Sequence, residues 1–154
     1  MNRVTWWVLG GVAFVAAVAI ALVAAVAIRA HLAPRLADEM LDQLSVSGYR
    51  KTHEYRDGLS SDAVFVGEYS PEPTRLVTGP ALKFSPIEVP AGIYTIVAEG
   101  SFGDARYAEC SVFVKQLTDV SPLVAGQGLT ADEARRVQDR TFGVVVLSVL
   151  CVGK

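Results

Sequence analysis

The most constraining feature of this chain is an uninterrupted apolar run of 25 residues, Val4–Ile28. The run contains no charged residue and no Pro, Asn or Gln, and Thr5 is its most polar side chain. As a helix it would be about 37 Å long, and the hydrocarbon core of a bilayer is about 30 Å thick. The run therefore predicts a tilted membrane-spanning helix, and we expect a transmembrane anchor over residues 1–29.

A cleaved signal peptide is the alternative for this segment. Ala25-Val26-Ala27 has the small-x-small pattern of a cleavage site. The apolar part of a signal peptide is usually about 7–15 residues long, however, so the length of the run favours an uncleaved signal-anchor.

Small residues recur at every fourth position within the run. Because such a stripe lets two transmembrane helices approach closely, it predicts a packing face for another membrane protein. The alternative is that the stripe only reflects the preference of the whole chain for Ala and Val. The residues concerned are Ala13, Ala17, Ala21 and Ala25. The general use of Ala, Val and Arg suggests a bacterial protein.

Two cysteines, Cys110 and Cys151, bear on the compartment. A cysteine pair in a small domain beside a membrane segment favours a disulfide in an oxidising compartment; two buried thiols in a reducing compartment are the alternative. The charges that flank the apolar run, Arg3 before it and Arg29 and Arg35 after it, nearly balance and do not decide the orientation. The cysteines therefore decide it. We expect a single-pass cell-membrane protein with a cytoplasmic N-terminus and its C-terminal domain outside the cytoplasm.

A second helical pattern predicts an amphipathic stalk helix over residues 30–48. Its apolar residues are spaced by four, and its acidic residues fall on the opposite side. Pro34 either kinks the helix or begins a new one, and Gly48 is expected to end it. The apolar stripe either packs on the domain that follows or contacts a neighbouring protein. For that contact the candidate residues are Leu36, Met40 and Leu44.

From Tyr49 onward, short β-rich segments alternate with Gly and Pro breakers. The expected strands are Ala63–Tyr69, Arg75–Thr78, Ala81–Ser85, Ile87–Val89, Ile93–Glu99, Tyr107–Lys115 and Thr141–Val152. The last is apolar, rich in Val and too short to span a membrane, so we expect it to be a central strand. The strand spacing predicts a mainly β chain with a small antiparallel β-sandwich or barrel, which forms an extracytoplasmic β-domain over residues 49–154.

Alternation within two of these strands predicts which side chains share a face. In Tyr107–Lys115, Cys110, Val112 and Val114 are expected on one face, which directs Phe113 outward. Outward Tyr107 and Phe113 are candidate contacts for a partner or ligand. In Ile93–Glu99 the shared face is expected to hold Tyr94, Ile96 and Ala98.

A single short helix is expected after residue 130. Thr130 and Glu133 have the spacing of a capping box, and the helix should extend to about Gln138. Arg135, Arg136 and Arg140 are expected toward its C-terminal end, where cations are favourable. The turn Val89–Tyr94, followed by a cysteine-bearing strand and a C-terminal cysteine, resembles β-sandwich modules of secreted bacterial proteins; the likeness concerns the fold and implies no activity.

The sequence offers little support for chemistry. From Leu36 onward there are 11 Lys/Arg and 16 Asp/Glu, a net charge of −5, which argues against nucleic acid as a partner. His31 and His53 have no second ligand at metal-binding spacing, so we expect no metal and no cofactor. Ser60-Ser61-Asp62 lacks a nucleophile motif and is expected to be a turn.

These features together favour a non-catalytic, membrane-anchored extracytoplasmic interaction module, an accessory or assembly subunit of an envelope membrane complex. Its expected partners are the lipid bilayer and another membrane protein that binds through the transmembrane or stalk helix. The alternative is a small-ligand-binding or surface-sensing β-sandwich domain, and a hydrolytic enzyme is the least favoured class.

Overall fold

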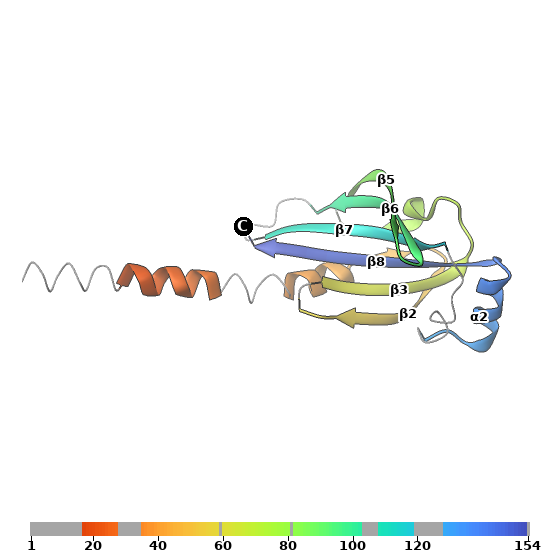
Figure 1. The fold of residues 1–154 in the computed structure, drawn as a ribbon, viewed down its shortest axis with the longest axis horizontal. Helices are drawn as coiled ribbons and strands as arrows, with labels where there is room; N and C mark the ends of the chain where they lie inside the picture. Colours follow the sequence, from red (N-terminus) through yellow and green to blue (C-terminus); the bar gives the residue numbers. More distant parts are fainter. Residues whose placement is uncertain are drawn as a thin grey trace, which may run out of the picture.

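The computed structural model describes residues 17–27, 35–58, 60–80, 82–102, 108–118 and 128–153 (Figure 1). Helices cover residues 17–27 and 35–42. The remaining elements are β1 (Ser45–Val46), β2 (Tyr49–Arg56), β3 (Ser60–Glu68), the 3-10 helix η1 (Pro73–Leu76), β4 (Val77–Thr78), β5 (Lys83–Ala91), β6 (Tyr94–Ser101), β7 (Ala108–Leu117), α2 (Ala131–Gln138) and β8 (Phe142–Gly153).

A six-stranded antiparallel sheet in the order β2-β3-β8-β7-β6-β5 dominates the fold. The Val-rich strand β8 lies inside it, paired with β3 and β7, so the predicted central strand is confirmed. Its residues are buried on both faces over much of its length: Val145 and Leu147 belong to one core cluster, and Val144 and Val146 to the other. Burial on both faces explains why this strand is almost continuously apolar.

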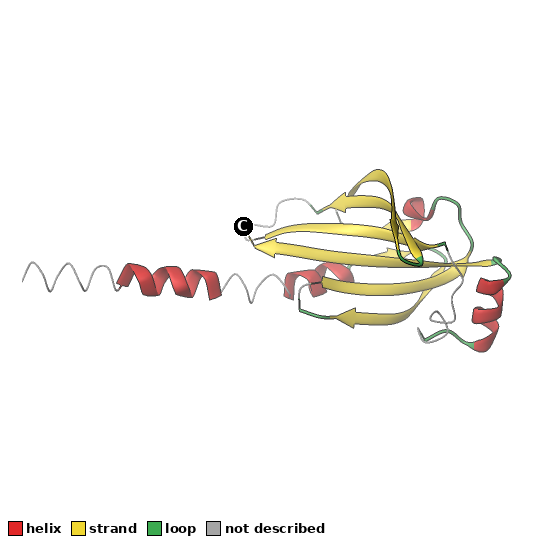
Figure 2. Ribbon diagram, in the orientation of Figure 1, coloured by secondary structure: helices red, strands yellow, loops and turns green. Residues whose placement is uncertain are grey.

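The chain is mainly β as predicted, but its main sheet belongs to neither a sandwich nor a closed barrel. In the described part of the chain, β2 and β5 end the sheet and do not pair with each other, and the second sheet is only the short β1–β4 pair. Figure 2 shows helical segments beside the one large sheet. The sandwich prediction was wrong because helices, rather than a second sheet, supply much of the apolar surface that covers this one.

The helix at residues 35–42 packs the predicted apolar stripe on the chain's own sheet. Ala37 and Leu41 are fully buried in the first core cluster, and Leu36 and Met40 pack against it. The predicted stalk helix over 30–48 is described only from residue 35, and it ends at residue 42, earlier than expected. It ends there because Ser45 and Val46 pair with β4 instead of continuing the helix.

Polar contacts fix this helix to the strands β2 and β3. The Ser61 hydroxyl donates to Asp38 at 2.5 Å, and Arg56 lies 3.4 Å from Asp38 and 2.9 Å from Asp42. The prediction of a turn at Ser60-Ser61-Asp62 was wrong, because these residues begin β3. Ser61 is only 2% exposed, so its hydroxyl needs the carboxylate partner that the helix supplies.

The disulfide between Cys110 and Cys151 is confirmed. The two residues are direct partners across β7 and β8, with Cα atoms 4.1 Å apart. Val112 and Val114 lie in the same core cluster as both cysteines, so the predicted face of β7 is also correct.

A register shift changes the predicted face of β6. Ala98 lies in the first core cluster, whereas Tyr94 packs against the second, on the other face of the sheet. The ladder between β6 and β7 is irregular between Ile96 and Ala98, and this extra residue reverses the alternation. The prediction that Tyr94, Ile96 and Ala98 share a face was therefore wrong.

Most of the predicted anchor Val4–Ile28 lies outside the described residues. Of its alanine stripe, Ala17, Ala21 and Ala25 fall on the exposed helix at 17–27, and Ala13 is not described. Within the described ranges, no helix is both long enough and apolar enough to cross a membrane.

Candidate ligand pocket at the end of the sheet

Of the residues predicted to contact a partner, those on the helix and just after it face the chain's own core. Leu44 is 3% exposed in the chain's own core, so its side chain is not available to another protein. Leu36 and Met40 are partly buried against that core. Phe113 is half-buried on β7, and Tyr107 lies outside the described residues. Among the described residues, Leu36, Met40 and Leu44 thus share one core cluster, and Phe113 lies on the other face of β7 from Val112 and Val114.

A polar cluster lies on the second face of the sheet, where β3, β7 and β8 meet. The Ser148 hydroxyl donates to the carboxylate of Asp62, and the Lys115 ammonium lies 3.7 Å from the same carboxylate oxygen. Ser148 is only 4% exposed. Its hydroxyl is buried and donates to a carboxylate that also faces a lysine. We therefore interpret this cluster as a structural polar contact between strands, and not as a site with a reactive serine.

The strongest candidate site is a cavity of about 350 Å³ at the end of the sheet where β8 begins, which we call the distal pocket. This end of β8 is opposite to the C-terminus and carries α2 (Figure 1). The volume lies at the small end of the range of ligand pockets. The lining residues come from the segment after β3, the end of β7, α2 and the start of β8: Tyr69, Gln116, Leu117, Thr118, Val137, Arg140, Phe142, Gly143 and Val144.

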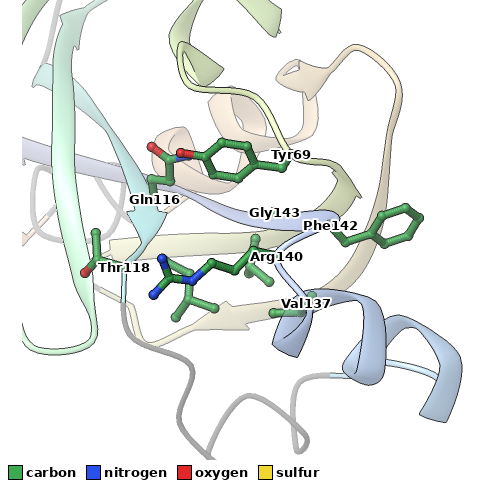
Figure 3. Close-up of a pocket in the computed structure, with 9 residues that line it drawn as sticks. Tyr69, Gln116, Thr118, Val137, Arg140, Phe142 and Gly143 are labelled. Atoms are coloured by element: carbon green, nitrogen blue, oxygen red, sulfur yellow. The ribbon is translucent and has the colours of Figure 1, made fainter.

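The distal pocket is apolar on one side and polar on the other. Val137 and Val144 are 3% and 0% exposed, and with the half-buried Leu117 they supply apolar surface. Polar side chains converge from separate segments, as Figure 3 shows, whereas the ring of Phe142 points away from them. The polar residues are Tyr69, Gln116, Thr118 and Arg140.

Two of these polar side chains are held by the backbone. The Gln116 amide donates to the carbonyl oxygen of Ser70 at 2.9 Å, and the Thr118 hydroxyl donates to the carbonyl oxygen of Ile93 at 3.2 Å. The first contact ties β7 to the segment after β3, and the second ties it to the turn before β6. These bonds place the amide oxygen of Gln116 and the hydroxyl oxygen of Thr118 at the pocket in fixed positions.

The predicted capping box positions α2. The Thr130 hydroxyl accepts from the backbone N–H of Glu133, and the Glu133 carboxylate accepts from the backbone N–H of Thr130, which confirms the prediction. Arg50 of β2 also donates to both oxygens of Glu133, at 2.8 and 2.6 Å. The bonds from Arg50 and then from Thr130 lower the pKa of Glu133 to about 2. One carboxylate thus caps α2 and joins it to the sheet.

The arginines of α2 are used differently from the prediction of simple helix-end charges. The guanidinium carbon of Arg136 lies 3.5 Å from the centroid of the Phe142 ring, a cation–π contact between α2 and β8. Arg140 lies beyond the helix and has a positive φ of 57°. Its guanidinium lines the distal pocket and makes no ion pair in the described part of the chain.

A second hollow, of about 700 Å³, adjoins the distal pocket and shares Tyr69 and Phe142 with it. Tyr49 lies in its wall, and its hydroxyl donates to the carbonyl oxygen of Glu68 at 2.5 Å. Burial raises the pKa of Tyr49. A Cβ on Gly67 would lie 2.7 Å from the Tyr49 ring, so glycine is needed there for the ring to pack against β3.

Metal binding has no support in the described residues, where no three His, Cys, Asp or Glu side chains are grouped closely enough to hold an ion. Of the residues around the distal pocket, the sequence predicts Arg140 only as a helix-end charge and gives no signal for Gln116. Neither lies in a recognisable motif, because the pocket is assembled from four separate segments. No protein-family model, no curated protein and no solved structure matches this chain.

Proposed function

We propose that this protein is a non-catalytic binding module that is anchored in a membrane by Val4–Ile28 and presents its binding site at the far end of its sheet. The observation that carries the proposal is the position of the helix at residues 35–42 relative to the distal pocket. That helix joins the N-terminal segment to the core, and the pocket lies at the other end of β8.

The separation can be followed along the strand β8. Asp38 of the helix bonds to Ser61, whose strand partner is Val149, near the end of β8. Gly143 and Val144, at the start of β8, line the pocket. The six residue-to-residue steps from Gly143 to Val149 span about 20 Å at about 3.4 Å each.

The apolar run is also close to the domain along the chain. Ile28 precedes Arg35 by seven residues, which cannot reach further than about 25 Å even when fully extended. An anchored chain would therefore hold the start of the helix at 35–42 near the bilayer and direct the distal pocket away from it. In this arrangement the site would be accessible to a soluble ligand or to the exposed part of a neighbouring protein.

The membrane part of the proposal is tested by extraction and labelling of full-length protein in cells. We expect an alkaline carbonate wash to leave the chain in the membrane pellet. In intact cells, a membrane-impermeant maleimide should label D132C, on the exposed side of α2, and should not label the matched N2C variant. Release by carbonate, or the reverse labelling pattern, would refute the anchor or its orientation.

The binding part is tested by recovery of partners in mild detergent. Tyr69, at the distal pocket, and Tyr55, on β2, are both exposed tyrosines, at 54% and 45%. We expect a partner or ligand that is recovered with the wild-type protein to be lost with Y69A and retained with Y55A. Equal retention by both variants would show that the distal end is not the binding site.

A further inference from the structure

The backbone at Arg140 is in a conformation that glycine adopts at much lower cost. Asp139 ends α2, and the backbone N–H groups of Arg140 and Thr141 donate to the carbonyl oxygens of Val137 and Arg136. These two bonds make a Schellman motif, in which the residue after the cap is left-handed and is usually Gly or Asn. Arg140 occupies that position with a φ of 57°.

A strained residue of this kind indicates a role for its side chain. Residues held in left-handed backbone conformations cluster at binding sites, where the surrounding structure maintains the strain. The guanidinium of Arg140 lines the distal pocket together with Gln116 of β7 and Thr118, the residue after β7, and it extends toward the side of Thr118 (Figure 3). The strain and the pocket are separate observations, and both involve the same residue.

Arg140 is a cationic residue of the distal pocket, and among the described residues its guanidinium forms no ion pair with a carboxylate. Glu133 is paired with Arg50, and the guanidinium of Arg136 lies on the ring of Phe142. The acidic neighbours are Asp139, adjacent in sequence, and Glu68, which lines the second hollow; neither forms an ion pair with Arg140 within the described ranges. The Schellman bonds occupy the carbonyl groups of Arg136 and Val137.

The volume and lining of the pocket limit the size and polarity of an anion that could bind there. Leu117, Val137 and Val144 supply an apolar surface, and about 350 Å³ admits only a small group. A guanidinium recognises the planar carboxylate by two parallel hydrogen bonds. The Gln116 amide has a second N–H that is not used in its bond to Ser70 and can donate to the carboxylate, whereas the Thr118 hydroxyl has donated its hydrogen to Ile93 and can only accept, for example from an amide N–H of the ligand.

We propose that the distal pocket binds the carboxylate of a small apolar group, such as a leucine-sized acyl amino acid or the C-terminal residue of a peptide, with Arg140 as the residue that holds the carboxylate. This inference rests on the proposed function only in taking the distal pocket as the binding site. It does not depend on the anchor or on the orientation.

The test uses the full-length chain in non-ionic detergent with two matched probes, N-acetyl-L-leucine and its neutral amide, N-acetyl-L-leucinamide. We expect the carboxylate probe to shift the amide resonances of residues 116–118 and 137–144 and the side-chain Nε–H resonance of Arg140. It should bind at least about tenfold more tightly than the amide, because a hydrogen bond to a charged group is lost in the latter. Equal binding of both probes, or binding of neither, would overturn the proposal.

Three variants assign the effect to the guanidinium. R140Q and R140G should each lower the affinity for the carboxylate probe by at least about tenfold. R135Q, on the exposed side of α2, should leave this affinity unchanged. If R135Q weakened binding of the carboxylate probe as much as R140Q, the effect would come from the net charge of the protein, and the assignment of Arg140 as the carboxylate ligand would be refuted.

A peptide arm separates the two sources of the carboxylate. A short peptide that ends in leucine with a free C-terminus is compared with the same peptide as a C-terminal amide. Binding of the free-acid peptide identifies a protein C-terminus as a ligand, and binding of N-acetyl-L-leucine alone identifies a small metabolite; both support the carboxylate pocket. If partners are recovered through Tyr69 but R140Q binds them normally, the proposed function stands and this inference fails.

Discussion

Replacing Arg140 by glycine should make the protein more stable while it removes ligand binding. A non-glycine residue in the left-handed region costs about 1–2 kcal/mol relative to the right-handed one. Glycine relieves this cost, but about 0.5–1 kcal/mol of the gain is lost again because glycine has more conformational freedom in the unfolded chain. The exposed guanidinium makes no ion pair in the described part of the chain, so little else is lost. We expect R140G to raise the free energy of unfolding by about 0.5–1 kcal/mol.

Thermal unfolding followed by circular dichroism measures this change in the full-length protein. For a chain of this length the gain corresponds to an increase in Tm of about 1–4 °C. R135G is the matched control, because it makes the same substitution inside α2, where the backbone is right-handed. There glycine should lower stability by about 1 kcal/mol.

A Tm of R140G that falls as far as that of R135G would show that the backbone at Arg140 is not strained. A third variant, R140A, separates strain from charge. It keeps a Cβ in the left-handed conformation, so it should lose carboxylate binding without the gain in stability. If R140A raised the Tm as much as R140G, the gain in stability would come from removing the guanidinium charge and not from relieving backbone strain.

Three further predictions concern the framework of the fold. E133Q should reduce the dependence of stability on pH: the lowered pKa of Glu133 stabilises the folded state above about pH 4.5, and this contribution is lost as the pH falls toward 2, which urea unfolding at several pH values would show. L41A should lower the free energy of unfolding by about 2–5 kcal/mol in urea titrations, because Leu41 is fully buried. Mass spectrometry of unreduced protein should show Cys110 joined to Cys151, and their replacement by serine should cost about 4 kcal/mol, since the bridge closes a loop of 41 residues.

The periodic parts of the fold were predictable from the sequence. β8 was recognised because burial on both faces requires an apolar run, and α2 was recognised because Thr130 and Glu133 cap it through local contacts. The disulfide followed from there being two cysteines in a small domain. In each case the signal lies within a short segment, or depends only on the number of cysteines.

The single sheet was not predictable by the same reasoning, because it depends on contacts between distant segments. The stripe of Ala37 and Leu41 fits either a packed helix or a free one, and only its burial on the sheet shows which. The irregular ladders near Pro86 and Ile96 are also invisible to a pattern of alternation. Each shift by one residue exchanges the faces of everything that follows it.

Arg140 shows how a site can escape sequence reasoning even when its residue has been noticed. Three arginines near the end of α2 have the same charge, and charge alone assigns all of them to the helix terminus. The backbone distinguishes them: Arg135 is exposed on the helix, Arg136 lies on Phe142, and Arg140 alone is in the left-handed conformation. Glycine would satisfy that backbone position at lower cost. An arginine there therefore needs a reason outside the helix, and the pocket that its side chain lines supplies one.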